Sequence, residues 1–326
     1  MQGKEASEQE TKVKSSVGID VSKDWLDVHI LPCGERLRIA NTADGIRRLK
    51  RRLMRFDLGL VVCEATGKWH RLLWRSLFAS AIPVAMIDPF KARMFARAQG
   101  IFAKTDRLDA AVLACFAAIM TPAIRPPPPQ AVEELAELAA AREAAVAEQT
   151  GLKNQLSAAN VAMLCRQLGR RIARLAKDIA ALEREILARI AADEGLARRY
   201  AILTSIPSIG PAVAATLVAR LTELGSLTDK QIAMLAGLAP VADQSGKHDG
   251  KRVIWGGRAR VRRMLYLAAV SAVRCNPDLR NLYRRLRAAG KPAKVALIAV
   301  ARKLVLLANT LIRQDRTWLL NPPKRT

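Results

Sequence analysis

Between residues 16 and 120 the apolar and polar positions alternate between short strand-like runs and longer helical periods. The strand-like runs cover Val17–Val21, Trp25–Leu31, 36–40, Leu58–Glu64 and 83–87, and helices are expected near 41–54, from Gly67, from Pro89 and from Thr105. Three early strands can pair as antiparallel hairpins, whereas the later parallel strands need crossover helices. This order predicts an α/β domain of the RNase H-like type over residues 16–125.

A proline run at residues 125–129 predicts a stiff, extended spacer, and we place a domain boundary there. The region 126–195 that follows is helical. Its second half carries a regular apolar seam at Val161, Cys165, Leu168, Ile172, Leu175, Ile179, Leu182 and Ile186. Alternating steps of four and three residues are typical of a coiled coil. We expect a helical arm that pairs helices within or between chains; the alternatives are a helix packed on its own domain or a hairpin bent near Gly169.

The last region, 196–326, is predicted to be mainly α-helical. Its opening at 203–214 resembles a helix-hairpin-helix motif, in which a tight turn aims backbone N–H groups at a phosphate. Ser208 stands where that motif usually has its first glycine, and an ordinary helix-turn-helix packing unit is the alternative. A helix at Gln231–Gly237, a loop at Leu238–Gly246 and helices at 281–287 and 293–312 follow, the last of them expected in the core.

The charge of the chain points to a polyanionic partner. The net charge is +25, and residues 196–326 hold 24 Lys and Arg against 6 Asp and Glu. Such a balance favours nucleic acid first and an anionic membrane second. No uninterrupted apolar run reaches the ~18 residues of a membrane span; the best candidate, Leu304–Ile312, is shorter. Residues 1–15 are polar, lack the apolar core of a signal peptide and predict a disordered tail.

Cysteine and histidine usage excludes two other classes. The five cysteines are scattered without close pairs, and the three histidines are dispersed. Neither a disulfide scaffold nor a zinc site is indicated. A reducing, cytoplasmic setting follows.

The segment from Lys247 to Arg263 holds seven basic residues and one acid, Asp249. A run this one-sided, beside Trp255, is read as a phosphate-contacting surface rather than as an ordinary solvated face. Arg258, Arg262 and Arg263 are expected to share one face of a helix. The candidate nucleic-acid-binding residues are Lys247, Lys251, Arg252, Arg258, Arg260, Arg262 and Arg263.

Four acids are the candidate metal ligands. Asp20 lies on the first strand and Glu64 ends the fourth, two strands that are neighbours in an RNase H-like sheet. Asp106 and Asp109 are three residues apart on a predicted helix, so they share a face. Oxygen ligands of this kind suit Mg²⁺ or Mn²⁺, and a pair of such ions can promote phosphoryl transfer. The other acids near strand ends were set aside as structural, and they are Asp24, Asp27, Asp44 and Asp88.

Four segments carry a family resemblance that covers roughly residues 16–320. They are Gly18-Ile-Asp20-Val-Ser-Lys23, Cys63-Glu64-Ala-Thr-Gly67, Lys104-Thr-Asp106-Arg-Leu-Asp109-Ala, and Gly237-Leu-Ala-Pro240 with Ser245-Gly246. In this order and spacing they resemble the DEDD insertion-sequence transposases, the bridge-RNA-guided recombinases. The resemblance implies a RuvC-like catalytic domain at 16–125, a linker and coiled-coil arm at 126–195, and a transposase domain at 196–326.

The resemblance also implies the chemistry. Asp20, Glu64, Asp106 and Asp109 would be the catalytic quartet, and Ser245 matches the family's serine, which attacks a DNA phosphate to form a phosphoserine link. The family assembles its active site from the quartet of one protomer and the serine of another within a tetramer, and a noncoding guide RNA pairs with donor and target DNA. From the residues alone, Ser245 is an ordinary loop serine. His248 is a possible base for Ser245 or a solvent-exposed loop residue.

We therefore expect a metal-dependent, RNA-guided DNA recombinase acting as a dimer to tetramer. Two alternatives stay open: a RuvC-like nuclease or junction resolvase that uses the quartet alone, and a non-catalytic basic protein that binds DNA or RNA. The target sequence leaves almost no trace in such a protein, because base pairing with the guide reads it.

Overall fold

The computed structural model describes residues 14–65, 67–102, 106–242, 244–245, 248–250 and 252–319, without the side chains of 106–108, 244–245 and 248–249. The chain divides into two compact units, Met1–Pro128 and Pro129–Thr326, and each is described by itself. A disordered tail was expected over residues 1–15. Residues 1–13 lie outside the described residues, and Ser15 belongs to the first strand.

A five-stranded mixed sheet forms the centre of the first unit. Its strands are β1 (Ser15–Val21), β2 (Trp25–Leu31), β3 (Glu35–Ala40), β4 (Leu58–Glu64) and β5 (Val84–Ile87). The strand order is β3-β2-β1-β4-β5. The first three strands are antiparallel neighbours, whereas β4 runs parallel to β1 and β5 parallel to β4. The RNase H-like order expected from the sequence is confirmed.

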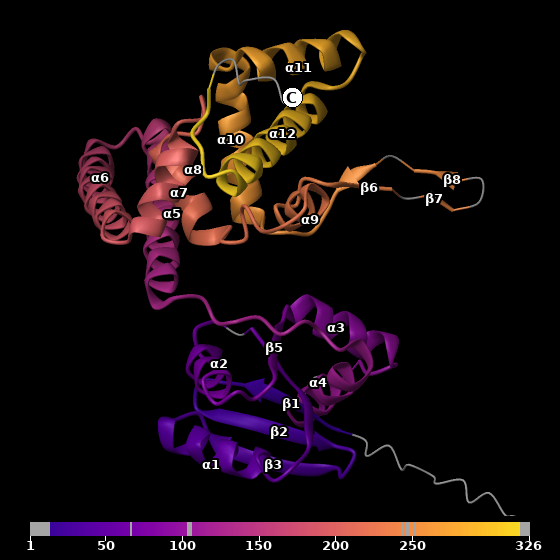
Figure 1. Ribbon diagram of the computed structural model, residues 1–326. Coiled ribbons are helices and arrows are strands. Elements are labelled where there is room, and N and C mark those ends of the chain that lie inside the picture. Colours follow the sequence, from indigo (N-terminus) through magenta and orange to yellow (C-terminus); the bar gives the residue numbers. More distant parts are fainter. Residues whose placement is uncertain are drawn as a thin grey trace, which may run out of the picture. The chain divides into compact units, whose positions relative to one another are not determined.

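Helices cover both faces of this sheet (Figure 1). They are α1 (Ala43–Leu53), α2 (His70–Phe78), α3 (Pro89–Ala98) and α4 (Asp106–Met120). One face packs α1 and α2 against the odd-numbered residues of β1, such as Val17 and Ile19, and the even-numbered residues of β2. The other face packs α3 and α4 against the even-numbered residues of β4, such as Leu60 and Val62. Two separate cores therefore enclose the sheet.

One helix start differs from the expectation. The sequence placed it at Gly67, but α2 begins at His70 after a turn. Gly67 has a φ of +50°, which a right-handed helix does not accommodate. Five residues, 65–69, separate the end of β4 from the helix, and the catalytic candidate Glu64 ends that strand.

The second unit is largely helical. Its helices are α5 (Gln130–Ala158), α6 (Ala162–Ala191), α7 (Glu194–Thr204), α8 (Pro211–Arg220), α9 (Asp229–Leu235), α10 (Ala259–Cys275), α11 (Pro277–Ala288) and α12 (Ala293–Arg313). A single core joins the base of the α5–α6 pair, including Leu135 and Ile186, to the helices that follow. The region 126–195 therefore shares its core with the C-terminal helices.

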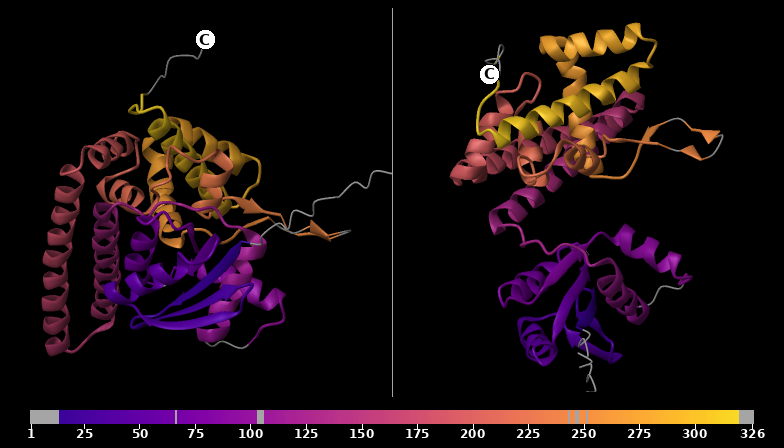
Figure 2. Two further views of the ribbon diagram at one scale, coloured as in Figure 1. Left: turned by 60° about the horizontal axis from the view of Figure 1, so that its bottom comes forward. Right: turned by 45° about the vertical axis from the view of Figure 1, so that its right-hand side comes forward.

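Helices α5 and α6 run antiparallel and side by side over most of their length (Figure 2). The seam residues from Cys165 to Leu182 are half-buried, and the next one, Ile186, is 2% exposed. The seam therefore pairs with α5 of the same chain. The helices pair within the chain, as a hairpin, but the alternative that placed its bend near Gly169 has the wrong position: the chain reverses at 159–161, and Gly169 lies inside α6 with open space around it.

Short strands replace the loop expected at Leu238–Gly246. They are β6 (Pro240–Val241), β7 (Gln244–Ser245), β8 (His248–Asp249) and β9 (Val253–Ile254). β6 pairs with β9 and β7 with β8, both antiparallel. Together they form a two-stranded ribbon that extends away from the helices of its own unit (Figure 1).

Helix α12 is the one helix of the described residues that is long and apolar enough to cross a membrane. The sequence analysis considered only the nine residues from Leu304 and judged them too short. Eight residues on one side of α12 are fully buried against the other helices, among them Val300, Leu304 and Ala308. This burial makes α12 a core helix of the second unit, as the sequence indicated.

Candidate active site

Asp20 and Glu64 end two neighbouring parallel strands. The register pairs Ile19 with Cys63, so the next residue on each strand is one of the two acids. Successive side chains on a strand point to opposite faces. Ile19 and Cys63 belong to the core beneath α1 and α2, so Asp20 and Glu64 both lie on the face that α4 covers.

The charge of Asp20 acts on the neighbouring strand. The thiol of Cys63 is buried, and its pKa is raised first by this burial and then by the negative charge of Asp20. Cys63 itself is inert in the core, since a buried thiol without a nearby cation does not ionise. The register of β1 and β4 places the Asp20 carboxylate one residue beyond the partner of Cys63.

Gly18 brings α4 directly onto β1. A Cβ at Gly18 would lie 2.1 Å from the carbonyl oxygen of Ala110 and 2.2 Å from the backbone nitrogen of Ala114. Only glycine permits this approach. Gly18 lies two residues before Asp20 on the same face, and Ala110 directly follows Asp109. The close contact therefore places the half-buried Asp109 beside the strand that carries Asp20.

Asp106 begins α4 one turn before Asp109, on the same side of the helix. Its side chain lies outside the described residues. Among the side chains that are described, no three of His, Cys, Asp and Glu gather as metal ligands. Asp20, Glu64 and Asp109 are described, so their side chains are not gathered as ligands in this structure. The topology brings only the elements that carry the quartet to the same end of β1 and β4. A donor set made only of carboxylate oxygens fits Mg²⁺ or Mn²⁺.

A fifth acid, Asp27, lies on the same face. The antiparallel register pairs Asp20 with Asp27, and directly opposed residues share a face of the sheet. Asp27 is 7% exposed, and its Oδ2 lies 3.5 Å from Nη2 of Arg38 on β3. From the sequence, Asp27 was interpreted as a structural acid. Side chains along a strand alternate between the two faces of a sheet. Counting this alternation from Asp20, through the tight turn and along β2, could have placed Asp27 on the face of Asp20.

His29 lies next along the same face, opposite Gly18. It is buried, and its Nδ1 has no hydrogen-bond partner among the described residues. Burial, and then the charge of Arg36, lower the pKa of its imidazole. His29 is therefore a buried residue on the face that α4 covers, and burial opposes its protonation.

The remaining acids that were set aside have structural contacts. Asp88 caps α3 by accepting a hydrogen bond from the backbone of Phe90 at 2.8 Å. Asp44 lies in the first turn of α1 and pairs with Arg47. Asp24 lies in the β1–β2 turn, where its carbonyl oxygen accepts a hydrogen bond from Asn41. These side-chain contacts explain Asp88 and Asp44 without a catalytic role, whereas the contact of Asp24 involves only its backbone.

Ser245 lies in the second unit, in β7 of the ribbon. Its register partner is His248 in β8. Their side chains, like those of the neighbouring residues 243–249, lie outside the described residues. The serine is therefore placed by its backbone alone, on a two-stranded ribbon rather than on a loop.

The basic candidates divide into engaged and exposed side chains. Arg258 precedes α10 and binds Glu223 through two hydrogen bonds of 2.6 Å, so it fixes the start of that helix instead of sharing its outer face. Arg260 lies 3.3 Å from Glu143, and Arg262 donates to the carbonyl of Gly256 at 2.6 Å. Arg252 and Arg263 are exposed, whereas Lys247 and Lys251 lie outside the described residues.

Helix α11 carries a basic surface that the sequence analysis did not select. Arg284 and Arg285 are exposed, and no ion pair is found for either among the described residues. The signal was available: in 277–288 the arginines lie on one side and Leu279 packs into the core. These side chains are better placed to meet phosphates than Arg258.

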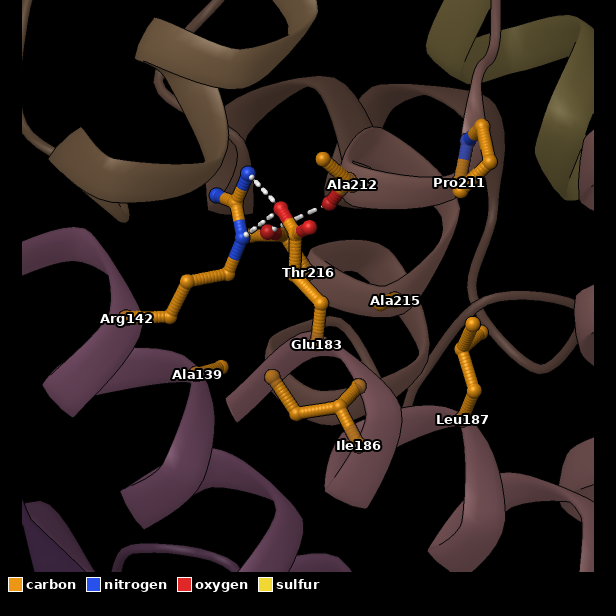
Figure 3. Close-up of a pocket in the computed structure, with 9 residues that line it drawn as sticks. All are labelled: Ala139, Arg142, Glu183, Ile186, Leu187, Pro211, Ala212, Ala215 and Thr216. Atoms are coloured by element: carbon orange, nitrogen blue, oxygen red, sulfur yellow. Dashed lines mark hydrogen bonds and ion pairs between the residues drawn. The ribbon is translucent and has the colours of Figure 1, made fainter. Parts of the chain in front are cut away.

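A cavity of about 450 Å³ lies between α5, α6 and α8 (Figure 3). Its lining is mostly apolar, with Ile186, Leu187 and Ala215 among the residues shown. The two charged residues of the lining bind each other: Nε of Arg142 donates a hydrogen bond to Oε1 of Glu183 at 2.8 Å. The cavity thus holds no uncompensated acid, base or nucleophile, and we assign it no chemistry.

Models of known protein families match segments of both units. A model described as "Transposase IS116/IS110/IS902 family" matches residues 200–284, and a DEDD transposase model of the IS110 group matches residues 17–161. The pilin gene-inverting proteins of Moraxella bovis and Moraxella lacunata are each 25% identical over 315 residues, which is 94% of this chain and 98% of theirs.

A further similar protein is the 43.6 kDa protein of insertion element IS110 from Streptomyces coelicolor. It is 32% identical over 114 residues, 34% of this chain and 28% of the relative. The matched segments include the strands and the helix that carry the acids. The chain belongs to the IS110/IS116/IS902 family of transposases, with a DEDD N-terminal domain and the family's second transposase domain in its C-terminal half.

Proposed function

We propose that the protein is an RNA-guided recombinase that excises and inserts a mobile element by cutting and rejoining donor and target DNA. The observation that carries the proposal is that Asp20 and Glu64 lie on the same face of the sheet, beneath α4. Gly18 allows this helix, which carries Asp109, to pack directly on the first strand. The full-length similarity to proteins named as gene inverters supports DNA rejoining rather than cutting alone.

In this proposal Asp20, Glu64, Asp106 and Asp109 hold Mg²⁺ or Mn²⁺. When bound, such ions neutralise charge on the phosphate and stabilise the leaving oxygen. The role of the carboxylates in this proposal is to hold the ions at the ends of β1 and β4, where the scissile phosphate would bind. Gly18 keeps α4 close enough for both halves of the quartet to act on one phosphate.

Ser245 supplies the nucleophile. Its Oγ attacks the phosphorus of one strand, the phosphorus–oxygen bond to the neighbouring nucleotide breaks, and that oxygen leaves with a proton. The hydroxyl end of another strand then attacks the phosphoserine and releases the serine. His248, the strand partner of Ser245, is the candidate base. These roles rest on the family resemblance and on the backbone position of Ser245.

The partners follow from the same reasoning. Donor and target DNA and a noncoding guide RNA are polyanions, and the second unit has a strong excess of Lys and Arg with an exposed basic α11. We propose a dimer to tetramer in which the quartet of one protomer acts with Ser245 of another. Its work takes place on chromosomal DNA in the cytoplasm.

Strand exchange with two variants tests the proposal. Ser245→Ala and Asp20→Asn should each abolish exchange between donor and target, whereas Ser271→Ala, at an exposed position of α10, should leave it intact. A nuclease or resolvase would lose activity only with Asp20→Asn, and a non-catalytic binding protein would keep its function in both. Either pattern contradicts the proposal. A protein–DNA adduct that forms with the wild type and not with Ser245→Ala would identify the nucleophile directly.

A further inference from the structure

An exposed tryptophan lies beside the acids on the α4 face. Trp25 begins β2, is 45% exposed and precedes Asp27 by two residues, so both lie on the face that carries Asp20. Diagonal neighbours across an antiparallel pair are about 7–8 Å apart, within reach of an aromatic side chain. The ring therefore stands next to the edge where the quartet converges.

Arg38 joins this ring to the acids. Its guanidinium carbon lies 5.5 Å from the centre of the Trp25 ring, and its Nη2 lies 3.5 Å from Oδ2 of Asp27. Half of the Arg38 side chain is exposed. A cation over an indole ring is a favourable pair that keeps the guanidinium available to a phosphate.

A second cation–tryptophan pair, of lysine instead of arginine, lies in the loop after β4. Lys68 Nζ is 5.1 Å from the centre of the Trp69 ring, which is 38% exposed. Nδ2 of Asn41 donates to the carbonyl of Ser22 at 2.9 Å and to that of Trp69 at 3.2 Å. This bridge ties the loop after β4 to the turn that follows Asp20.

The composition of this edge is specific. The chain has only five tryptophans, and these two are exposed with a basic group over each ring. An edge built from carboxylates repels a phosphate backbone, so cations beside it are needed to hold a strand. Exposed aromatic rings bind unpaired bases by stacking, whatever the sequence, and arginine adds to the contact.

We propose that Trp25 with Arg38, and Trp69 with Lys68, form a stacking platform that holds unpaired nucleotides of the DNA strand next to the acid quartet. This rests on the proposed function, because it assumes that DNA is cut at this edge. The platform would splay the bases beside the scissile phosphate and present that phosphate to the acids. Asp27 would orient Arg38 and so act as a positioning residue.

Photocrosslinking tests the platform in the full-length protein. The probe is oligothymidylate DNA with a single 5-iodouracil, and the protein carries Asp20→Asn so that no strand is cut. We expect the crosslink in the tryptic peptide 24–36, which contains Trp25, and its loss in Trp25→Ala. The Trp25→Ala, Trp69→Ala double variant should bind the oligonucleotide at least about fivefold more weakly.

Phe78→Ala is the matched control, because Phe78 is 38% exposed and ends α2, at the other end of that helix from Trp69. Crosslinks confined to residues 129–326, or an effect of Trp25→Ala no larger than that of Phe78→Ala, would overturn the platform. Equal competition by oligouridylate RNA would overturn its assignment to DNA. Failure of the proposed function would show separately, as strand exchange that survives Asp20→Asn while the Trp25 crosslink is present.

Discussion

Gly18 determines how closely α4, which carries Asp106 and Asp109, approaches the sheet. The residue has an ordinary strand conformation, so its role is spatial: a methyl group there would overlap the backbone of α4 at Ala110 and Ala114. Sequence reasoning identified Asp20 two residues later but gave Gly18 no role, because a glycine in a strand carries no periodic signal. The contact depends on a helix about 90 residues away and is visible only in the fold.

Gly18→Ala should displace α4 and separate Asp109 from Asp20. We expect it to lower the free energy of unfolding of the first unit by about 1–3 kcal/mol or more. It should also abolish strand exchange. Urea unfolding and the exchange assay measure the two effects. Gly59→Ala is the control in the same sheet, where the added methyl meets the side chain of Lys14 at 3.1 Å and the carbonyl oxygen of Ser15 at 3.5 Å and should change stability by less than about 1 kcal/mol. Equal effects of the two variants would refute this role of Gly18.

Ser208 is a second position where one residue determines local structure. It has a φ of +93°, in the region that favours glycine, and its buried Oγ has no hydrogen-bond partner among the described residues. The sequence analysis noted that the helix-hairpin-helix motif usually has glycine there. The backbone keeps the glycine conformation although the residue is serine.

Ser208→Gly should therefore stabilise the protein by about 1 kcal/mol, because it removes both the left-handed strain and an unsatisfied buried hydroxyl. Thermal or urea unfolding measures the change. The control is Ser205→Gly, since Oγ of Ser205 accepts a hydrogen bond from the backbone of Trp318 at 2.8 Å and donates to Ile202. We expect that variant to be destabilised. A loss of stability in Ser208→Gly would be inconsistent with strain at this residue.

At the scale of elements, the strands and helices of the first unit could be predicted because each buries one continuous apolar face. The ribbon at 240–254 could not, because strands of two residues in a polar segment leave no period. The α5–α6 seam was visible as a coiled-coil spacing, but the position of the turn was not. Gly169 lies within α6 with open space around it, and the packing that holds this helix comes from the seam residues on either side.

The start of α10 depends on one ion pair. Arg258 binds both carboxylate oxygens of Glu223 and donates to the carbonyl of Arg220 at the end of α8. Burial alone would raise the pKa of Glu223, but the hydrogen bonds and charge of Arg258 outweigh it and hold that pKa below its ordinary value. The sequence could not show this, because the partners are 35 residues apart.

The sign of this shift gives a pH prediction. A lowered folded pKa stabilises the protein above the ordinary glutamate pKa of 4.5, and the contribution is lost as the pH falls towards the folded pKa. Glu223→Gln should cost about 1–3 kcal/mol at neutral pH and flatten the fall in stability below pH 4.5. Urea unfolding at several pH values measures both. An unchanged pH profile in the variant would contradict the coupling.

At the scale of the whole molecule, the sequence shows two kinds of surface: a sheet edge rich in acids in the first unit and an excess of positive charge in the second. Which arginines face solvent could not be predicted, because a basic segment does not reveal its own ion pairs. Arg258 and Arg260 are paired with acids from other elements, whereas Arg284 and Arg285 on α11 are exposed.

Affinity for duplex DNA should therefore fall steeply with added salt, and α11 should contribute to the slope. Replacing both Arg284 and Arg285 by alanine should reduce the slope of log K against log salt concentration by about 1–2, since each phosphate contact contributes about 0.9. Arg171→Ala is the control, because Arg171 lies 3.4 Å from Glu148 and should leave the slope unchanged. Fluorescence anisotropy at several salt concentrations measures it, and a flat titration of the wild type would exclude a phosphate-contacting surface.

The central claim is that four acids far apart in the sequence hold divalent metal at one place. Replacing Mg²⁺ by Fe²⁺ and generating hydroxyl radicals cuts the backbone next to the bound metal, and the fragments can be mapped by mass. We predict cuts near Asp20, Glu64 and the Asp106–Asp109 turn together, suppressed by excess Mg²⁺ and absent in Asp20→Asn. Cuts at only one of these segments, or cuts that persist in Asp20→Asn, would contradict the account.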